Sequence, residues 1–216
     1  MTQRLCYFCS NSKEMINQQR KSISLILLAI FVLGACIDKK NENPHITGLP
    51  QFSLLSPTET NINFINKIKE NIFTHENVLT FEYYYNGGGV GIVDLNNDGL
   101  SDIVLAGNCV TNKIYLNKGN LKFEDITETS GINIANYWTN GVCLADVNND
   151  GYTDLYFSNG GAKISPAERQ NQLFINNGDL TFTEKAGQLG INDDNFSTQS
   201  SFFDYDKDGD LDLFVM

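Results

Sequence analysis

The sequence predicts an all-β fold made of repeated units, of the kind found in a partial β-propeller. A nine-residue acidic pattern occurs three times, and its copies start 52 and 58 residues apart. Short runs rich in β-branched and aromatic residues flank each copy, and each of the first two repeats holds four such runs. A repeat of about 50 residues with four short strands is typical of a propeller blade. We therefore expect an incomplete propeller over residues 51–216, with about three calcium loops and a truncated last blade.

Each copy of the acidic pattern carries carboxylate or amide oxygens at positions 1, 3, 5 and 9 and glycine at position 6. This spacing suits calcium, which takes about six to eight oxygen ligands in a flexible shell. The residue at position 7 can add its backbone carbonyl, and glycine lets the chain turn sharply. The expected ligands are Asp94, Asn96, Asp98, Leu100 and Asp102 in the first copy, Asp146, Asn148, Asp150, Tyr152 and Asp154 in the second, and Asp204, Asp206, Asp208, Asp210 and Asp212 in the third.

Other interpretations of the acidic pattern fit less well. An EF-hand loop needs a glutamate at position 12 and flanking helices, but position 12 here is Leu105, Phe157 or Val215 and the flanks are strand-like. A polar turn between two strands is the plain alternative for one copy. Three copies with crowded carboxylates favour a cation, because such groups repel one another without it. Magnesium demands a more rigid octahedron than calcium.

The charge of the chain limits its partners. The net charge is −11, which argues against nucleic-acid binding, since that function wants a basic face. Eleven of the 26 acidic residues lie in the three copies of the pattern. The acidity is therefore largely local, as expected of metal sites.

The N-terminal region predicts an export signal over residues 1–35. Arg20 and Lys21 precede a largely apolar run of 11 residues, 23–33, which is too short to span a bilayer but suits a signal peptide. The run ends in Leu33-Gly-Ala-Cys36, which resembles a bacterial lipobox. That resemblance implies lipidation of Cys36 after cleavage; an ordinary secretory signal is the alternative. Met15 is an alternative start.

Residues 36–50 are polar and without period, and we expect a flexible tether there. After it, Ile62, Ile65, Ile68 and Ile72 have helical spacing and predict a short amphipathic helix. The aromatic stretch Leu79–Tyr85 predicts a strand. Its three tyrosines are expected to be half-buried in that strand, and a sugar-binding surface is the alternative.

The repeats then predict strands in a regular order. The first repeat predicts strands over 90–93, 103–105, 113–117 and 121–124. The second predicts strands over 141–145 and 155–157 and a hairpin over 173–182. The third predicts strands over 199–203 and 213–216. The second repeat is longer by an insertion near 159–171, which we expect to be a surface loop.

The sequence gives little support to enzyme chemistry. Both histidines, His45 and His75, precede the repeats, and no nucleophile elbow, catalytic triad or zinc ligand set is present. Cys6 and Cys9 form a CxxC upstream of the signal, where it is incidental. Cys109 and Cys143 occupy non-equivalent places in the repeat, so unpaired, largely buried thiols are favoured over a disulfide.

The acidic pattern with its flanking strands resembles the FG-GAP/VCBS-type repeats of integrin α-subunit propellers. Tyr85-Asn-Gly-Gly-Gly89, Trp138-Thr139 and Ser197-Thr198-Gln199 before Phe202-Phe203-Asp204 carry a narrower resemblance. They are similar to VCBS-repeat lipoproteins of Bacteroidetes-like bacteria, relatives of cartilage acidic proteins. The resemblance covers roughly residues 50–216. It implies calcium in the three loops and longer full-length members with more repeats, and hence a fragment here.

These observations together predict a calcium-binding, lipid-anchored propeller module outside the cytoplasm, on the outer membrane or cell surface. It would bind a glycan or a protein partner and would not be an enzyme. Two alternatives stay open. One is an enzyme or enzyme subunit acting on polysaccharide, with its catalytic part outside this chain. The other is a purely structural assembly module.

Overall fold

The computed structural model describes residues 52–132 and 137–216. The predicted signal, Cys36 and the tether lie outside these residues. The sheets all belong to one compact unit, Leu54–Met216. Within the described ranges, no helix has the length and apolar character needed to cross a membrane.

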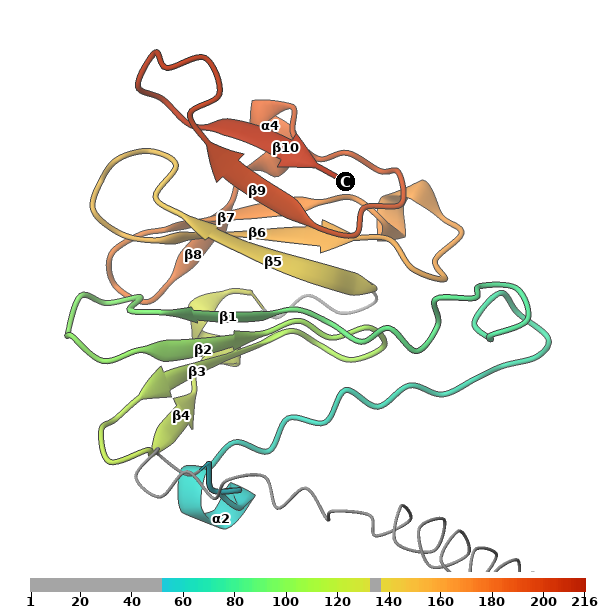
Figure 1. Ribbon diagram of the computed structural model, residues 1–216, viewed down its shortest axis with the longest axis horizontal. Helices are drawn as coiled ribbons and strands as arrows, with labels where there is room; N and C mark the ends of the chain where they lie inside the picture. The colour runs from blue at the N-terminus through green and yellow to red at the C-terminus, as the bar shows by residue number, and fades with distance from the viewer. Residues whose placement is uncertain (1–51, 133–136) are drawn as a thin grey trace, which may run out of the picture. The chain divides into compact units, whose positions relative to one another are not determined.

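The first sheet is a four-stranded antiparallel meander (Figure 1). Its strands are β1 (Val90–Val93), β2 (Asp102–Leu105), β3 (Lys113–Asn117) and β4 (Phe123–Asp125), and each pairs with the next along the chain. This connectivity is the one expected of a propeller blade.

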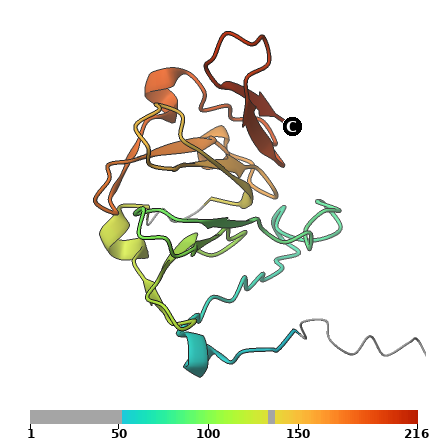
Figure 2. The same ribbon diagram turned by 60° about the vertical axis from the view of Figure 1, so that its left-hand side comes forward.

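The second sheet repeats the first, and a third follows it. The second consists of β5 (Thr139–Ala145), β6 (Asp154–Asn159), β7 (Gln172–Asn176) and β8 (Phe182–Glu184), in the same antiparallel order. The third pairs β9 (Ser200–Phe203) with β10 (Asp212–Val215). The first strands of the three sheets, β1, β5 and β9, lie next to one another, as both views show (Figures 1 and 2). The prediction of an all-β fold built from propeller-type blades is confirmed.

The helices in the described part of the chain are short. They are α2 (Pro57–Thr60), α3 (Thr127–Ser130), α4 (Ala186–Leu189) and the 3-10 turn η1 (Pro166–Glu168). Helices α3 and α4 follow the last strands of the first and second sheets, β4 and β8. Each ends at a glycine in the left-handed conformation, Gly131 (φ 83°) or Gly190 (φ 71°), which is a common helix stop. Helix α4 packs against β7. The repeat unit is therefore four strands and one helical turn.

Apolar layers between the sheets form the core. Strand β6 is buried along its whole length, and its side chains alternate between two layers. Leu155 and Phe157 join the layer shared with the first sheet, whereas Tyr156 joins the layer shared with the third. The first layer is completed by Leu95, Val104, Ile114, Leu116, Ile126, Ile132, Val142, Phe174 and Phe182. Packing on both faces makes each sheet depend on its neighbours.

The helix predicted over Ile62–Ile72 is wrong. Helix α2 ends earlier, where Asn61 takes a left-handed φ of 64°. The asparagines that follow bond to the first blade. The backbone N–H of Asn63 donates to the Tyr115 hydroxyl (3.3 Å), and Asn66 Nδ2 donates to Asn108 Oδ1 (2.6 Å). The Asn63 side chain also donates to the nearby carbonyl of Asn61 (3.4 Å). Such bonds compete with helical hydrogen bonding, which the isoleucine spacing does not reveal.

The strand predicted over Leu79–Tyr85 is also wrong, because this stretch forms successive turns. Buried Asn77 is the cause. Its side-chain oxygen accepts from the N–H of Leu79 (2.9 Å), and its carbonyl accepts from the N–H of Phe81 (3.0 Å). An asparagine that holds its own following backbone in this way favours a turn. Tyr84 is consequently buried, whereas Tyr83 and Tyr85 are exposed.

The last strand of each blade starts later than predicted. Leu121 (φ 58°) and Leu180 (φ 65°) lie in the left-handed turns that precede β4 and β8. Their apolar side chains suggested strand, but the two blades share the same turn. Phe123 and Phe182 are the first strand residues, and they pair with Asn117 and Asn176.

Candidate functional site

The three acidic loops occupy equivalent places. Each loop follows the first strand of a sheet and leads into the second, so the loops connect β1 to β2, β5 to β6 and β9 to β10. All three lie at the same end of these strands, on the left of Figure 1. The first and second loops touch, because Asn97 Nδ2 donates to the carbonyl of Gly151 (3.0 Å).

The three loops share one backbone conformation. The residue at position 4 is left-handed in each, at Asn97 (58°), Asn149 (57°) and Lys207 (67°). The glycine at position 6 is also left-handed in each, with φ between 84° and 99°. Three differing sequences that take the same unusual conformation indicate a common structural requirement. The left-handed residue at position 4 was not anticipated from the sequence.

The carboxylate at position 1 lies inside the turn of its loop. Asp94 Oδ1 accepts from the N–H of Asp98 (3.1 Å), and Asp94 Oδ2 accepts from the N–H of Gly99 (2.7 Å). Asp146 makes the same bonds with Asp150 and Gly151 (3.1 and 2.8 Å). Each loop therefore winds around its first carboxylate.

The side chains at positions 3 and 5 meet beside it. Asn96 Nδ2 donates to Asp98 Oδ2 (3.0 Å), and Asn148 Nδ2 donates to Asp150 Oδ2 (2.7 Å). In the third loop, Asp204, Asp206 and Asp208 each offer a carboxylate oxygen, and these oxygens lie within 4.8 Å of one another. The structure thus brings together the predicted ligands at positions 1, 3 and 5.

Position 9 behaves differently, since its carboxylate is buried in the first two loops. Asp102 is 0% exposed and Asp154 is 1% exposed. Asp102 Oδ2 accepts from the N–H of Leu95 (2.9 Å), and its Oδ1 accepts from the N–H of Asn117 (2.7 Å). Asp154 repeats this with Val147 (2.9 Å) and Asn176 (2.8 Å). A carboxylate keeps further lone pairs, so it can hold the loop and still face a cation.

No positively charged side chain of the described residues pairs with the two buried carboxylates. Burial raises the pKa of Asp102 and Asp154 above the ordinary value, and the neighbouring carboxylates at positions 5 and 1 add to this. Backbone N–H donors oppose the rise. Among the ion pairs of residues 52–132 and 137–216, none includes a loop carboxylate. The oxygen-only donor set and the uncompensated charge therefore fit a calcium ion.

The third loop is more exposed than the other two. Tyr205 N–H donates to Asp212 Oδ2 (2.8 Å), which repeats the position 9 contact. Hydrogen bonds from the Asp210 backbone and side chain lower the pKa of Asp208, and the bond to Asp208 raises the pKa of Asp210. A hydrogen bond between these two carboxyl groups needs a proton on one of them. A cation bound in the loop would reduce the repulsion between the two charges without that proton.

Sequence reasoning missed the asparagines that end the third strands. Asn117 Nδ2 donates to the carbonyl of Ser101 (2.8 Å). Asn176 Nδ2 reaches further and donates to the carbonyl of Leu95 in the neighbouring blade (2.9 Å). An asparagine at the same place in both repeats was the available signal. These residues connect the acidic loops to the blades.

A family model described as "FG-GAP-like repeat" matches residues 94–157 and 163–215, which include all three loops. The chain belongs to the FG-GAP repeat family. The matched segments run across β2 to β10, so the FG-GAP repeats coincide with the blades. The matched family model describes a repeat module.

The chain is also similar to a protein named "Cartilage acidic protein 1" from Xenopus tropicalis. The two are 27% identical over 199 aligned residues, which cover 83% of this chain. The chain spans only 28% of the length of that relative. The relative's function as a whole therefore does not transfer to this chain with the similarity.

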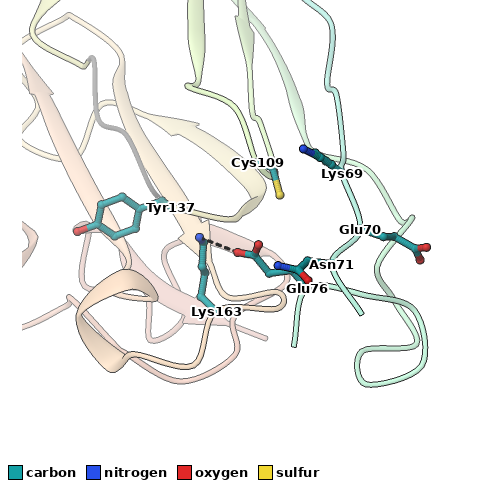
Figure 3. A pocket seen from close by; sticks show the side chains of 7 residues that line it. All are labelled: Lys69, Glu70, Asn71, Glu76, Cys109, Tyr137 and Lys163. Carbon is teal, nitrogen blue, oxygen red and sulfur yellow. Dashed lines mark hydrogen bonds and ion pairs between the residues drawn. The ribbon is translucent and has the colours of Figure 1, made fainter. Parts of the chain in front are cut away.

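A charged pocket of about 520 Å³ lies away from the loops of this FG-GAP protein. Figure 3 shows the Cys109 thiol facing the gap between Lys69 and the Lys163–Glu76 ion pair. That pair closes at 3.1 Å and neutralises both charges. Tyr137 lines the other side, and burial raises the pKa of its hydroxyl.

Cys109 and Cys143 are unpaired, as expected, but Cys109 is exposed rather than buried. The reason is that the pocket opens in front of it. Desolvation by the surrounding chain nevertheless raises the pKa of the Cys109 thiol, and Glu76 adds to the effect. A raised pKa keeps the thiol protonated at neutral pH, where it is a poor nucleophile. Cys143 is half-buried.

Proposed function

We propose that this FG-GAP protein is a calcium-stabilised binding module that works outside the cytoplasm. The observation that carries the proposal is the pair of buried carboxylates, Asp102 and Asp154. Each carboxylate accepts hydrogen bonds from two backbone N–H groups and lies beside further acidic side chains. Neither carboxylate takes part in an ion pair of the described residues. A calcium ion in each loop would offset the burial of these charges.

Calcium would act here as a structural brace. The ligands come from loops that join the first and second strands of each sheet, and the first two loops are in contact. Metal binding that occurs only in the folded state stabilises it by mass action. A braced set of sheets can present a preformed face to a partner, which lowers the entropic cost of binding.

The proposed location rests on the N-terminal sequence. The apolar run 23–33 and the lipobox-like Leu33-Gly-Ala-Cys36 support export and lipid attachment at Cys36. The anchor would hold the module at a membrane surface, where a glycan or a protein is the available partner. Detergent-phase partitioning of the wild type, lost in Cys36→Ser, would support the anchor. Equal partitioning of both proteins would reject it.

Counting bound ions by native mass spectrometry tests the calcium proposal. The wild type should carry three calcium ions, one for each acidic loop. Asp98→Ala and Asp150→Ala should each carry one fewer. Glu124→Gln is the matched control, because Glu124 is an exposed acid in β4 whose ion pair with Lys118 is long at 3.5 Å. Loop variants that retain all three ions would contradict the assignment.

A further inference from the structure

An uncharged pocket opens at the opposite end of the first strands from the acidic loops. It has a volume of about 460 Å³, within the range of about 300–1,000 Å³ that is usual for ligand sites. Its lining includes three aromatic rings, two amides and two hydroxyls, from Phe81, Tyr83, Phe196, Asn86, Asn140 and Thr198. We call it the aromatic pocket.

Three repeats contribute to the aromatic pocket. Asn86 lies shortly before β1, Asn140 lies at the start of β5, and Thr198 lies shortly before β9. All three residues therefore lie near the start of the first strand of their blade. The pocket therefore exists only when the sheets are assembled side by side.

The charge of the aromatic pocket limits its ligand. None of its lining residues is acidic or basic, although the chain has a net charge of −11. A charged ligand would find no counter-charge in this lining and would lose its hydration there. The lining therefore selects a neutral molecule.

A buried tryptophan supports two of the aromatic rings of the pocket. Trp138 is 1% exposed, and its ring contacts Phe81 edge-to-face at 5.9 Å. Phe81 in turn contacts Tyr83 edge-to-face at 5.9 Å. Tyr83 remains 56% exposed. An exposed ring that packs on a partly buried one, itself held by the buried Trp138, offers contact area at little entropic cost.

Phe196 is fixed from the other side of the pocket. The Arg169 guanidinium lies 4.4 Å from the centre of its ring, and Arg169 Nε donates to the carbonyl of Asp194 (3.0 Å). Phe196 is nevertheless 61% exposed. An exposed phenylalanine held by a cation–π contact has no role in the described core, and it is positioned for a ligand.

Polar groups complete the lining. Asn140 Nδ2 donates to the carbonyl of Ser197 (2.7 Å), which fixes its amide and leaves Oδ1 as an acceptor. Thr198 Oγ1 donates to the carbonyl of Met216 (3.1 Å) and can accept from a ligand. Fixed acceptors beside exposed rings match a ligand that has hydroxyl groups around an apolar ring face.

We propose that the aromatic pocket binds a neutral sugar ring of a glycan. The C–H face of the sugar would stack on Tyr83 or Phe196, and its hydroxyls would donate to Asn140 and Thr198. The negative face of an aromatic ring attracts the C–H groups of the sugar. The Asn140 and Thr198 oxygens at the edge of the pocket can accept from the sugar hydroxyls. The proposal deepens the proposed function, on which it rests, by naming the ligand class of the binding module.

Fluorescence titration of the purified full chain with neutral oligosaccharides tests the proposal. Gluco-, manno-, galacto- and xylo-oligosaccharides are the probes. Trp138, the single tryptophan, contacts the pocket ring Phe81 and reports occupancy. At least one probe should bind saturably, and Tyr83→Ala and Phe196→Ala should each weaken it about tenfold.

Tyr85→Ala is the matched control, since Tyr85 is 63% exposed and does not line the pocket. Its affinity should stay within about twofold of wild type, which is within ordinary mutational scatter. Isothermal calorimetry on the same samples measures affinity without relying on Trp138.

Calcium-dependent melting on the same samples separates this proposal from the function on which it rests. A protein that calcium stabilises but that binds no neutral probe would overturn the sugar site and leave the calcium module standing. Binding only of charged glycans or of peptides, or equal affinities in Tyr83→Ala and wild type, would also overturn it. A protein that calcium does not stabilise would overturn the proposed function instead.

Discussion

Asp154 Oδ1 accepts a hydrogen bond of 2.8 Å from the backbone N–H of Asn176, which joins the second acidic loop to the third strand of its blade. The first blade repeats this relationship between Asp102 and Asn117 at 2.7 Å. The ninth residue of the pattern therefore has a structural task in addition to any bound cation. The loops and the blades are a single hydrogen-bonded unit.

Asp154→Asn should destabilise the protein. The amide keeps one acceptor, but its NH₂ group would face a backbone N–H that the carboxylate satisfies, so one buried donor loses its partner. We expect a loss of about 1–3 kcal/mol in the free energy of unfolding. Denaturant titration in excess calcium measures this loss. Glu124→Gln, at an exposed site, should stay within about 0.5 kcal/mol of wild type.

The metal-free protein should respond to pH through Asp102 and Asp154. Burial raises the pKa of both carboxyls, so the folded state binds more protons than the unfolded state between the ordinary and the raised pKa. Their contribution to stability therefore falls as pH rises through this window and stays low above it. In chelator, the melting temperature of the wild type relative to an Asp102→Asn, Asp154→Asn double variant should rise on acidification. If the difference in melting temperature between the wild type and the double variant stayed constant from pH 7 to the lowest pH at which both fold, this prediction would be wrong.

Gly161→Ala should disturb the packing of Trp138. Gly161 has a φ of 62°, and a Cβ there would overlap Trp138 Cγ. We expect the free energy of unfolding to fall by about 1–3 kcal/mol, because of overpacking and backbone strain. We also expect the Trp138 emission to shift to the red. Thermal melts and emission spectra check this.

Gly187→Ala is the contrasting glycine variant. Gly187 lies in α4, and the nearest atom to an added Cβ is 3.8 Å away. Alanine at such a helical site should be neutral or stabilising by up to about 1 kcal/mol. Equal behaviour of the two glycine variants would remove the special role given to Gly161.

Asn176→Ala should weaken the junction between the first two blades. It removes the bond from Asn176 Nδ2 to the carbonyl of Leu95, which lies in the neighbouring blade and is buried. The unsatisfied carbonyl should cost about 1–3 kcal/mol. Asn117→Ala is the repeat-matched control, because the Asn117 amide bonds only within its own blade, to Ser101 and Gly119. Equal losses in denaturant unfolding would show that the cross-blade bond adds nothing.

The sequence predicted the blades well because their signals are local and occur twice. Each acidic loop marks the boundary between two strands, so Asp94 and Asp146 located β1, β2, β5 and β6. The region before the first blade was predicted poorly. Its isoleucines have helical spacing, but Asn63 and Asn66 bond to distant partners, Tyr115 and Asn108. Periodicity carries no information about such contacts.

The aromatic pocket could be found only in the structure. Tyr83 and Phe196 are more than a hundred residues apart in the chain, and neither belongs to a recurring motif. The turn that exposes Tyr83 depends on Asn77, and the position of Phe196 depends on Arg169 from the inserted loop. The first is a local turn that overrides strand propensity, and the second is a tertiary contact that no local pattern reveals.

Calcium titration calorimetry on the full chain, paired with thermal melts in calcium and in chelator, tests the central claim most directly. The account predicts about three bound ions, one for each acidic loop, and a higher melting temperature in calcium. Each site should add about 2.7 kcal/mol at a free calcium concentration 100-fold above its dissociation constant. A cooperative melt that is the same in calcium and in chelator, with no heat of binding, would contradict the account and leave the loops as polar turns.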